Sequence, residues 1–280
     1  MLATALVWVV ERVVPALPSR LDGPLSEVAG TAAYLLSSGS RAAVRDNLAI
    51  VAPDRPDRER LVRRTFVNQV RHYLEIFRLV RLSPAAIIEE VRIIGWDTFE
   101  RAHRAGRGVV LASAHVGPVS LCGQIFTARG MPLTMPIEKE TSALVRSVNR
   151  ARRAMGLRFV ETESALGIGR VLRRGEILGI LADRAVTGVG ERVTFFGREA
   201  LLPSAHVALA LRSGAALVPA FARREGDRYV ADLRPPIELE RTGDQSEDVR
   251  RGVQAFARTL EREILRAPEE WSVFERIWDR

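Results

Sequence analysis

Residues 108–120 read GVVLASAHVGPVS, an apolar run that ends in a histidine and a Gly-Pro pair. A short aliphatic run closed by glycine and proline is typical of a buried strand that leads into a helix. Pro118 suits the first helical position, where its missing N–H costs nothing. We therefore expect His115 in a strand-to-helix turn, at the carboxyl edge of a sheet where open α/β proteins bind their ligands.

Apolar runs of this kind recur through the middle of the chain and alternate with amphipathic segments. The runs cover residues 109–114, 133–137, 157–160, 177–182, 217–222 and 229–233. Such alternation predicts parallel strands joined by crossover helices. We expect an α/β fold with a mixed, mostly parallel sheet covered by helices, its core spanning residues 106–235.

The segments on either side of this core are expected to be helical. Residues 25–36, 41–51 and 57–80 show helical periodicity, and Ser83-Pro84 is typical of a helix start. A closing helix is predicted over residues 254–265, before an aromatic tail at 270–278. Because no linker composition interrupts the chain, we expect a single domain over residues 1–280, with a helical N-terminal region at 1–90 and a C-terminal helix and tail at 246–280.

The chain is basic, with 42 Lys and Arg against 34 Asp and Glu and a formal net charge of +8. Such a charge suits anionic lipid, phosphorylated substrates or nucleic acid. No nucleic-acid partner is expected, because the sequence has no zinc-ligand cluster and no basic run interleaved with aromatic residues. Four scattered histidines and one cysteine predict neither a metal site nor an internal disulfide.

No segment offers the 18 or so uninterrupted apolar residues that a membrane-spanning helix needs. Met1–Val10 is apolar but is followed at once by Glu11 and Arg12. Two interpretations stay open for this segment: a short helix lying in the membrane interface, or a helix docked on the protein's own core.

Several motifs occur in a fixed order along the chain. They are Arg45-Asp46-Asn47-Leu48, Phe66-Val67-Asn68 with Glu75, Gly106–Val110, Ala114-His115-Val116-Gly117, Leu181-Ala182-Asp183-Arg184, Val193–Arg198, Leu211–Ala215, Val218-Pro219 and Trp271–Trp278. In order and spacing this set resembles the lysophospholipid acyltransferase superfamily. Its nearest branch is similar to the late acyltransferases of lipid A biosynthesis and to their relatives that acylate phosphatidylinositol mannosides.

The resemblance implies that His115 is the catalytic base and that Ser120 occupies a catalytic position. In the family, an Asp or Glu stands five residues after the histidine and stabilises its protonated form; here that residue is Ser120. A serine holds a ring nitrogen by a hydrogen bond but carries no charge. Another acid is therefore a candidate partner of His115. The sequence leaves Glu138, Glu140, Asp183 and Glu191 open for this role.

Arginines are the expected phosphate-binding groups, because a planar guanidinium binds two oxygens at once. The helix predicted over residues 141–155 carries several of them on one face, which is either a phosphate clamp or a solvated surface. The resemblance favours Arg150 or Arg153. It also assigns substrate binding to Asp183, Arg184, Phe195, Gly197 and Arg198.

Together these features predict a membrane-associated O-acyltransferase on the cytoplasmic face of the cell membrane. The enzyme would move a fatty acyl group from an acyl thioester, either acyl-CoA or acyl-carrier protein, to a hydroxyl of a phospholipid or glycolipid. No cofactor is expected beyond this donor. The alternative is a non-catalytic lipid-binding protein on the same scaffold, and it rests on the replacement of the acid by Ser120.

Overall fold

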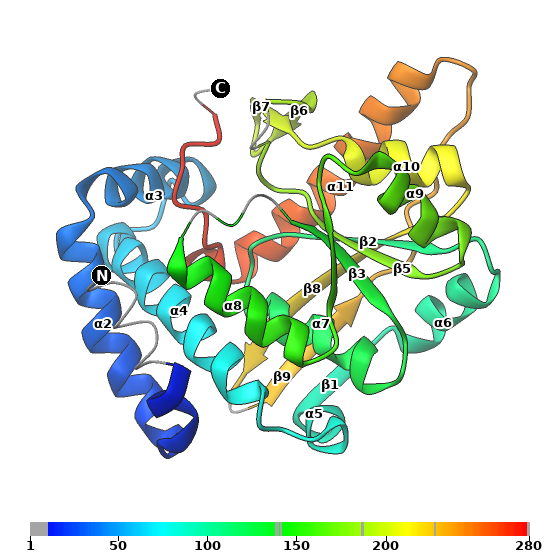
Figure 1. Ribbon diagram of the computed structural model, residues 1–280. Coiled ribbons are helices and arrows are strands. Elements are labelled where there is room, and N and C mark those ends of the chain that lie inside the picture. The colour runs from blue at the N-terminus through cyan, green and yellow to red at the C-terminus, as the bar shows by residue number, and fades with distance from the viewer. Residues whose placement is uncertain (1–10, 138–139, 141, 186–187, 227, 279–280) are drawn as a thin grey trace.

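The computed structural model describes residues 11–137, 140, 142–185, 188–226 and 228–278. The apolar segment Met1–Val10, with its two interpretations, lies outside the described residues. The chain then begins with helices, as predicted (Figure 1). After the 3₁₀ turns η1 (Val14–Ala16) and η2 (Ser19–Leu21) come α2 (Asp22–Leu36), α3 (Ser38–Val51), α4 (Arg58–Leu79) and α5 (Pro84–Glu90).

The centre is a seven-stranded sheet in the order β1-β9-β8-β2-β5-β3-β4. Its strands are β1 (Val91–Ile94), β2 (Val109–Ser113), β3 (Leu133–Ile137), β4 (Arg158–Glu161), β5 (Ile177–Leu181), β8 (Ala216–Glu225) and β9 (Arg228–Leu233). All neighbouring pairs are parallel except β8 with β9. The mixed, mostly parallel sheet predicted from the apolar runs is confirmed.

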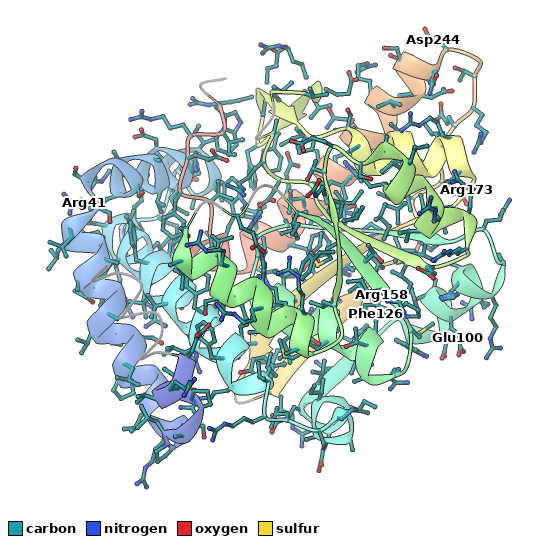
Figure 2. All side chains as sticks on the ribbon, viewed as in Figure 1. Arg41, Glu100, Phe126, Arg158, Arg173 and Asp244 are labelled. Atoms are coloured by element: carbon teal, nitrogen blue, oxygen red, sulfur yellow. The ribbon has the colours of Figure 1, made fainter. Side chains whose placement is uncertain are left out.

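Both faces of the sheet are covered, so the side chains of a central strand divide between two cores. In β2, Val110 and Ala112 join one core with α9 (Ala165–Arg173), α10 (Ala205–Ser213) and α11 (Gln245–Arg266). Val109 and Leu111 join the other core with α5, α6 (Trp96–Arg104) and α7 (Val119–Ala128). Phe126 of α7, labelled among the side chains in Figure 2, belongs to this second core. Burial on both sides explains why β2 is an uninterrupted apolar run.

The N-terminal helices pack beside the sheet. The apolar faces of α4 and α8 (Ala143–Ala154) share one cluster, and those of α3 and α4 share another. Figure 1 shows α2, α3, α4 and α8 gathered on this side. Among the described helices none is both long and apolar enough to cross a membrane.

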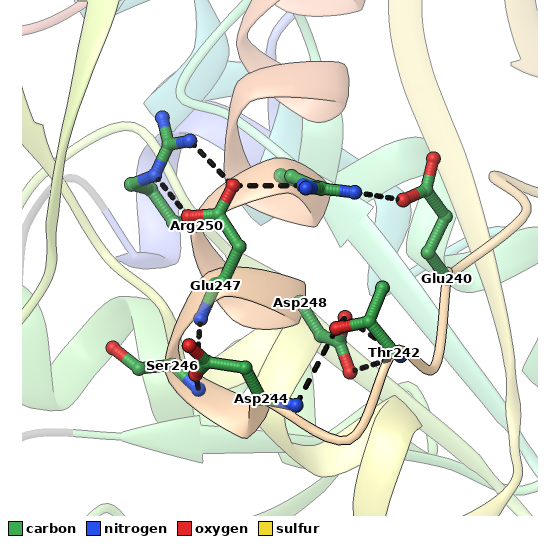
Figure 3. A network of polar contacts seen from close by, with 8 residues as sticks. Glu240, Thr242, Asp244, Ser246, Glu247, Asp248 and Arg250 are labelled. Atoms are coloured by element: carbon green, nitrogen blue, oxygen red, sulfur yellow. Dashed lines mark hydrogen bonds and ion pairs between the residues drawn. The ribbon is translucent and has the colours of Figure 1, made fainter.

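The strands β1, β6 and β7 were not predicted, and α11 is longer than predicted. Residues 191–202, in which a substrate-binding block was expected, form an antiparallel hairpin of β6 (Glu191–Phe195) and β7 (Arg198–Leu202). The closing helix α11 begins at Gln245 rather than at residue 254. Its start is fixed by polar contacts (Figure 3): Asp244 accepts from the backbone N–H groups of Ser246 and Glu247. This N-cap makes a polar first turn stable, although it shows no apolar periodicity.

His206, near the start of α10, has a fully buried side chain whose ring packs edge-on against Phe256, with centroids 4.8 Å apart. Burial lowers the pKa of His206 to about 3, because apolar surroundings disfavour the charged ring. The residue is thus a core group.

We expect His206→Leu to flatten the acid limb of the stability profile. Below pH ~6.5 the unfolded chain protonates this histidine, while the folded chain leaves it neutral. The free energy of unfolding therefore decreases by about 1.4 kcal/mol for each unit by which the pH is lowered. Urea unfolding of parent and variant on both sides of that pH isolates the contribution of His206. Identical pH slopes in the two proteins would contradict the assignment.

Candidate active site

His115 and Asp183 meet because their strands are parallel neighbours in register. Ser113, the last residue of β2, pairs with Leu181, the last residue of β5. The ladder continues one step further, where the Ala182 N–H donates to the Ser113 carbonyl at 2.8 Å. His115 and Asp183 each follow their strand end by two residues, so both lie at the same point of the carboxyl edge. This edge is where open α/β folds place their functional groups.

The carboxylate of Asp183 accepts three hydrogen bonds. Its Oδ1 lies 2.8 Å from Nδ1 of His115, and its Oδ2 accepts from the backbone N–H of His115 at 2.9 Å. The indole Nε1 of Trp271 donates to Oδ2 at 3.0 Å. Asp183 is fully buried, whereas 28% of the His115 side chain is exposed. The structure therefore selects Asp183 from the four candidate acids.

Burial alone raises the pKa of a carboxyl group, but at Asp183 the charge and hydrogen bonds of His115, with the Trp271 N–H, outweigh it and hold the pKa below its usual value. An ionised carboxylate only accepts hydrogen bonds, so Nδ1 of His115 carries its hydrogen. In the neutral ring, Nε2 then keeps its lone pair and can accept a proton.

A C-terminal segment closes over the turn that carries His115. The backbone N–H of Gly117 donates to the Glu270 carbonyl at 3.0 Å, and that of Ser272 donates to the His115 carbonyl at 2.8 Å. Trp271 stands between Glu270 and Ser272 in the chain, and its indole donates to Asp183. The C-terminal segment thus holds the backbone of the turn that carries His115.

Gly117 has a φ of +64°, and a Cβ at this position would lie 2.3 Å from the Ala222 carbonyl oxygen. Only glycine fits this close approach of the two backbones. The N–H of Gly117 is donated to the Glu270 carbonyl and is therefore engaged within the protein.

A hollow opens beside His115, between α4, α8 and the start of α7. The described residues that line it are Gln69, His72, Tyr73, Glu75, Ile76, Leu79, His115, Gly117, Pro118, Val119, Ser120, Leu121, Arg152 and Ser272. Because His115 is in this lining and its Nδ1 contacts Asp183, Nε2 is the ring nitrogen that is left for a ligand in the hollow.

Ser120 also lines the hollow, but its hydroxyl is engaged by an arginine. Its Oγ accepts from Nη2 of Arg152 at 2.7 Å and from Nε at 3.1 Å. Nη1 of Arg152 donates to Oδ1 of Asn149 at 3.2 Å. The position that holds an acid in the family is therefore occupied here by a neutral group facing Arg152. The catalytic role predicted for Ser120 stays a prediction.

Two more ionisable groups lie in the wall of the hollow, and each has a partner. His72 of α4 contacts a carboxylate oxygen of Glu270 at 3.1 Å. Burial opposes ionisation of Glu270, but the hydrogen bond and charge of His72 and the nearby arginines hold its pKa below the usual value. The carboxylate of Glu75 is paired with Arg224, and the guanidinium of Arg71 lies 3.4 Å away.

The two predicted phosphate-binding arginines of α8 are not among the residues that line the hollow. Arg150 is 70% exposed and lies 3.6 Å from Glu11, and Arg153 pairs with Glu140 at 3.1 Å. Arg184 pairs with Glu275 at 3.3 Å. The substrate-binding role of these residues stays a prediction.

The predicted binding residues of the hairpin serve the packing of β6 and β7. Phe195 is fully buried and stacks on Trp278, with centroids 5.5 Å apart. Gly197 supplies the φ of +72° that the hairpin turn needs, and Arg198 begins β7 as an exposed side chain. These positions are likewise absent from the residues that line the hollow.

Sequence reasoning missed Arg152. The expected face ran through Arg146, Asn149, Arg150 and Arg153, at offsets of three, four and seven. Arg152 follows the buried Val148 by four residues and so lies at the border of the apolar face, turned toward the protein. The position of Arg152 beside the buried Val148 and Ala151 could have indicated that its side chain faces the protein.

The family of bacterial lipid A biosynthesis acyltransferases matches residues 1–280. The chain belongs to this family. It is an acyltransferase, as the order of its motifs predicted. The phosphatidylinositol mannoside acyltransferase of Mycolicibacterium smegmatis is 28% identical over 257 residues, covering 88% of this chain and 82% of that protein. The protein of the same name from Mycobacterium tuberculosis strain H37Rv is 26% identical over 257 residues, with coverages of 88% and 80%.

We expect Trp271→Phe to destabilise this acyltransferase more than Trp278→Phe. The first change removes an N–H donor from a buried carboxylate, which costs about 1.5–3 kcal/mol. The second removes a donor from the backbone carbonyl of Phe195, 3.1 Å away, which costs about 0.5–1.5 kcal/mol. Urea unfolding of the two variants above pH ~6, where the carboxylate is ionised, measures the difference. Equal losses would show that the Asp183 charge gains nothing from the indole.

Proposed function

We propose that this enzyme transfers a fatty acyl group from a thioester to a hydroxyl of a glycolipid, with His115 as general base. The observation that carries the proposal is the His115–Asp183 pair, in which Nδ1 is held by the buried carboxylate and the ring borders the hollow. A histidine oriented by a third group in this way is suited to accept a proton from an attacking hydroxyl.

The proposed step is direct acyl transfer. The acceptor oxygen attacks the thioester carbonyl carbon while its proton moves to Nε2 of His115. The tetrahedral intermediate collapses, the carbon–sulfur bond breaks, and the leaving sulfur takes the proton back from Nε2, giving an ester and a free thiol. During the step Asp183 stabilises the imidazolium through its contact with Nδ1.

The non-catalytic alternative loses its main support. It rested on the absence of an acid five residues after His115, and Asp183 supplies a carboxylate from the neighbouring strand. A glycolipid acceptor is supported by the names of the two mycobacterial relatives, which act on phosphatidylinositol mannosides. The donor is proposed as acyl-CoA or acyl-carrier protein, and both are assayed.

We expect His115→Ala to lower acyl transfer by about 10²- to 10⁴-fold, the usual contribution of general acid–base catalysis. The variant also loses a donor to the buried Asp183 carboxylate, which costs about 1.5–3 kcal/mol, so turnover is compared at a temperature at which both proteins are folded. Labelled acyl-CoA and acyl-carrier protein serve as donors, with phosphatidylinositol mannosides as the first acceptor. The matched control is His103→Ala on α6, which leaves the hollow intact. Turnover equal to the parent in His115→Ala would remove the catalytic assignment.

Membrane association at the cytoplasmic face is proposed through α2. This helix exposes an apolar stripe in which Val28, Leu35 and Leu36 are 73%, 63% and 85% exposed. Exposed large apolar side chains on one helix, in a protein of net charge +8, suit the interface of an anionic bilayer.

We expect Val28→Glu with Leu36→Glu to weaken binding to anionic vesicles at least about tenfold, since each apolar side chain buried in the bilayer contributes about 1.5–3 kcal/mol. The control double variant, Leu166→Glu with Leu265→Glu, places the same charges on exposed leucines of α9 and α11. Co-sedimentation of both proteins should also decrease with salt. If the two double variants bind alike, α2 is not the membrane face.

A further inference from the structure

Arg152 carries a charge that no described carboxylate balances. Its printed hydrogen bonds go to the hydroxyl of Ser120 and the amide oxygen of Asn149, both neutral acceptors. Among the described residues, no Asp or Glu oxygen forms an ion pair with its guanidinium. A partly buried cation without a counter-charge is unfavourable, because hydration is reduced and no ion pair compensates.

Arg152 differs from the neighbouring arginines Arg150 and Arg153 in having no described carboxylate partner. Arg150 and Arg153 of the same helix are exposed and paired with carboxylates. Within the hollow, the carboxylate of Glu75 is already occupied by Arg224, and Glu270 behind it by His72. These two carboxylates thus have partners within the protein, while no described carboxylate pairs with Arg152.

The atoms around Arg152 are suited to an anion with several oxygens. An arginine has five N–H groups, and the three contacts to Ser120 and Asn149 leave two free to donate. Ser120 Oγ accepts from Arg152, so its own hydrogen is also free to donate. Ser120 lies in the first turn of α7, whose positive end adds to the field.

We propose that Arg152 and Ser120 form a subsite for a phosphate group of the substrate, in the hollow beside His115. The inference deepens the proposed function and rests on it for the identity of the ligand. Phosphate is present both in the headgroup of a phosphatidylinositol acceptor and in the phosphopantetheine arm of the donor. Paired probes with and without phosphate distinguish these two sources.

The test is calorimetric titration of the full chain with two pairs of soluble compounds. Glycerophosphoinositol and inositol represent the acceptor headgroup, and phosphopantetheine and pantetheine represent the donor. The variant is Arg152→Gln. The charge-matched control is Arg104→Gln at the end of α6, an exposed residue that pairs with Glu100 (labelled in Figure 2).

We expect one phosphate compound to bind the parent and Arg104→Gln more tightly than its phosphate-free counterpart. Arg152→Gln should bind this phosphate compound at least about tenfold more weakly than the parent, because a hydrogen bond to a charged group contributes about 1.5 kcal/mol or more. Its affinity for the phosphate-free compound should equal that of the parent. The pair that responds identifies the source. Equal affinity of Arg152→Gln and the parent for both phosphate compounds overturns the proposal, as does a parent that does not distinguish the members of either pair.

A second variant separates binding from structure. Ser120→Asp provides Arg152 with an internal counter-charge, so thermal stability should be kept or raised while phosphate affinity falls about tenfold relative to the uncharged Ser120→Asn. Equal phosphate affinity in these two variants contradicts the subsite. The titrations need no turnover, so they can fail while acyl transfer stands, and they can succeed if His115→Ala proves fully active.

Discussion

The site depends on one buried carboxylate that must be satisfied from three directions. Asp183 is fully removed from water, and a buried charge without partners is among the most costly groups a fold can contain. Its oxygens accept hydrogen bonds from the ring and the backbone N–H of His115 and from the indole N–H of Trp271. These bonds fix the end of β2 against the end of β5, and both against the C-terminal segment. The orientation of His115 thus follows from the need of the buried Asp183 carboxylate for hydrogen-bond donors.

The same edge shows how charge is distributed within the hollow. The carboxylate of Glu75 in its wall is paired with Arg224, and Glu270 behind it contacts His72. Among the described residues, Arg152 donates to the neutral oxygen atoms of Ser120 and Asn149. A serine at position 120, where the related enzymes hold an acid, leaves this arginine without a counter-charge and changes the local electrostatics. The acid that contacts His115 is supplied by Asp183, whereas the residue at position 120 contacts Arg152.

Patterns local in the sequence predicted most of the fold. The buried strands were visible as apolar runs, and the amphipathic helices as three- and four-residue periodicity. The start of α11 was placed too late: Asp244 caps a polar first turn, and the buried stripe already begins at Val249. No apolar run predicted the four-residue edge strand β1. Within the site, His115 followed from the strand–turn pattern. Asp183 stayed one of four candidates until the register of β2 and β5 was known, and the Ser120–Arg152 contact depends on how α8 is set against α7.

Residues 270–272 supply contacts that complete the site late in synthesis. Trp271 follows Asp183 by 88 residues, and its neighbours Glu270 and Ser272 hold the backbone of the turn that carries His115. A nascent chain that has completed β2 and β5 on the ribosome still lacks the indole donor and the backbone partners of this turn. The histidine and its carboxylate acquire their final arrangement only after translation has passed this segment. The full set of hydrogen bonds to Asp183 therefore exists only in a chain that includes residues 270–272.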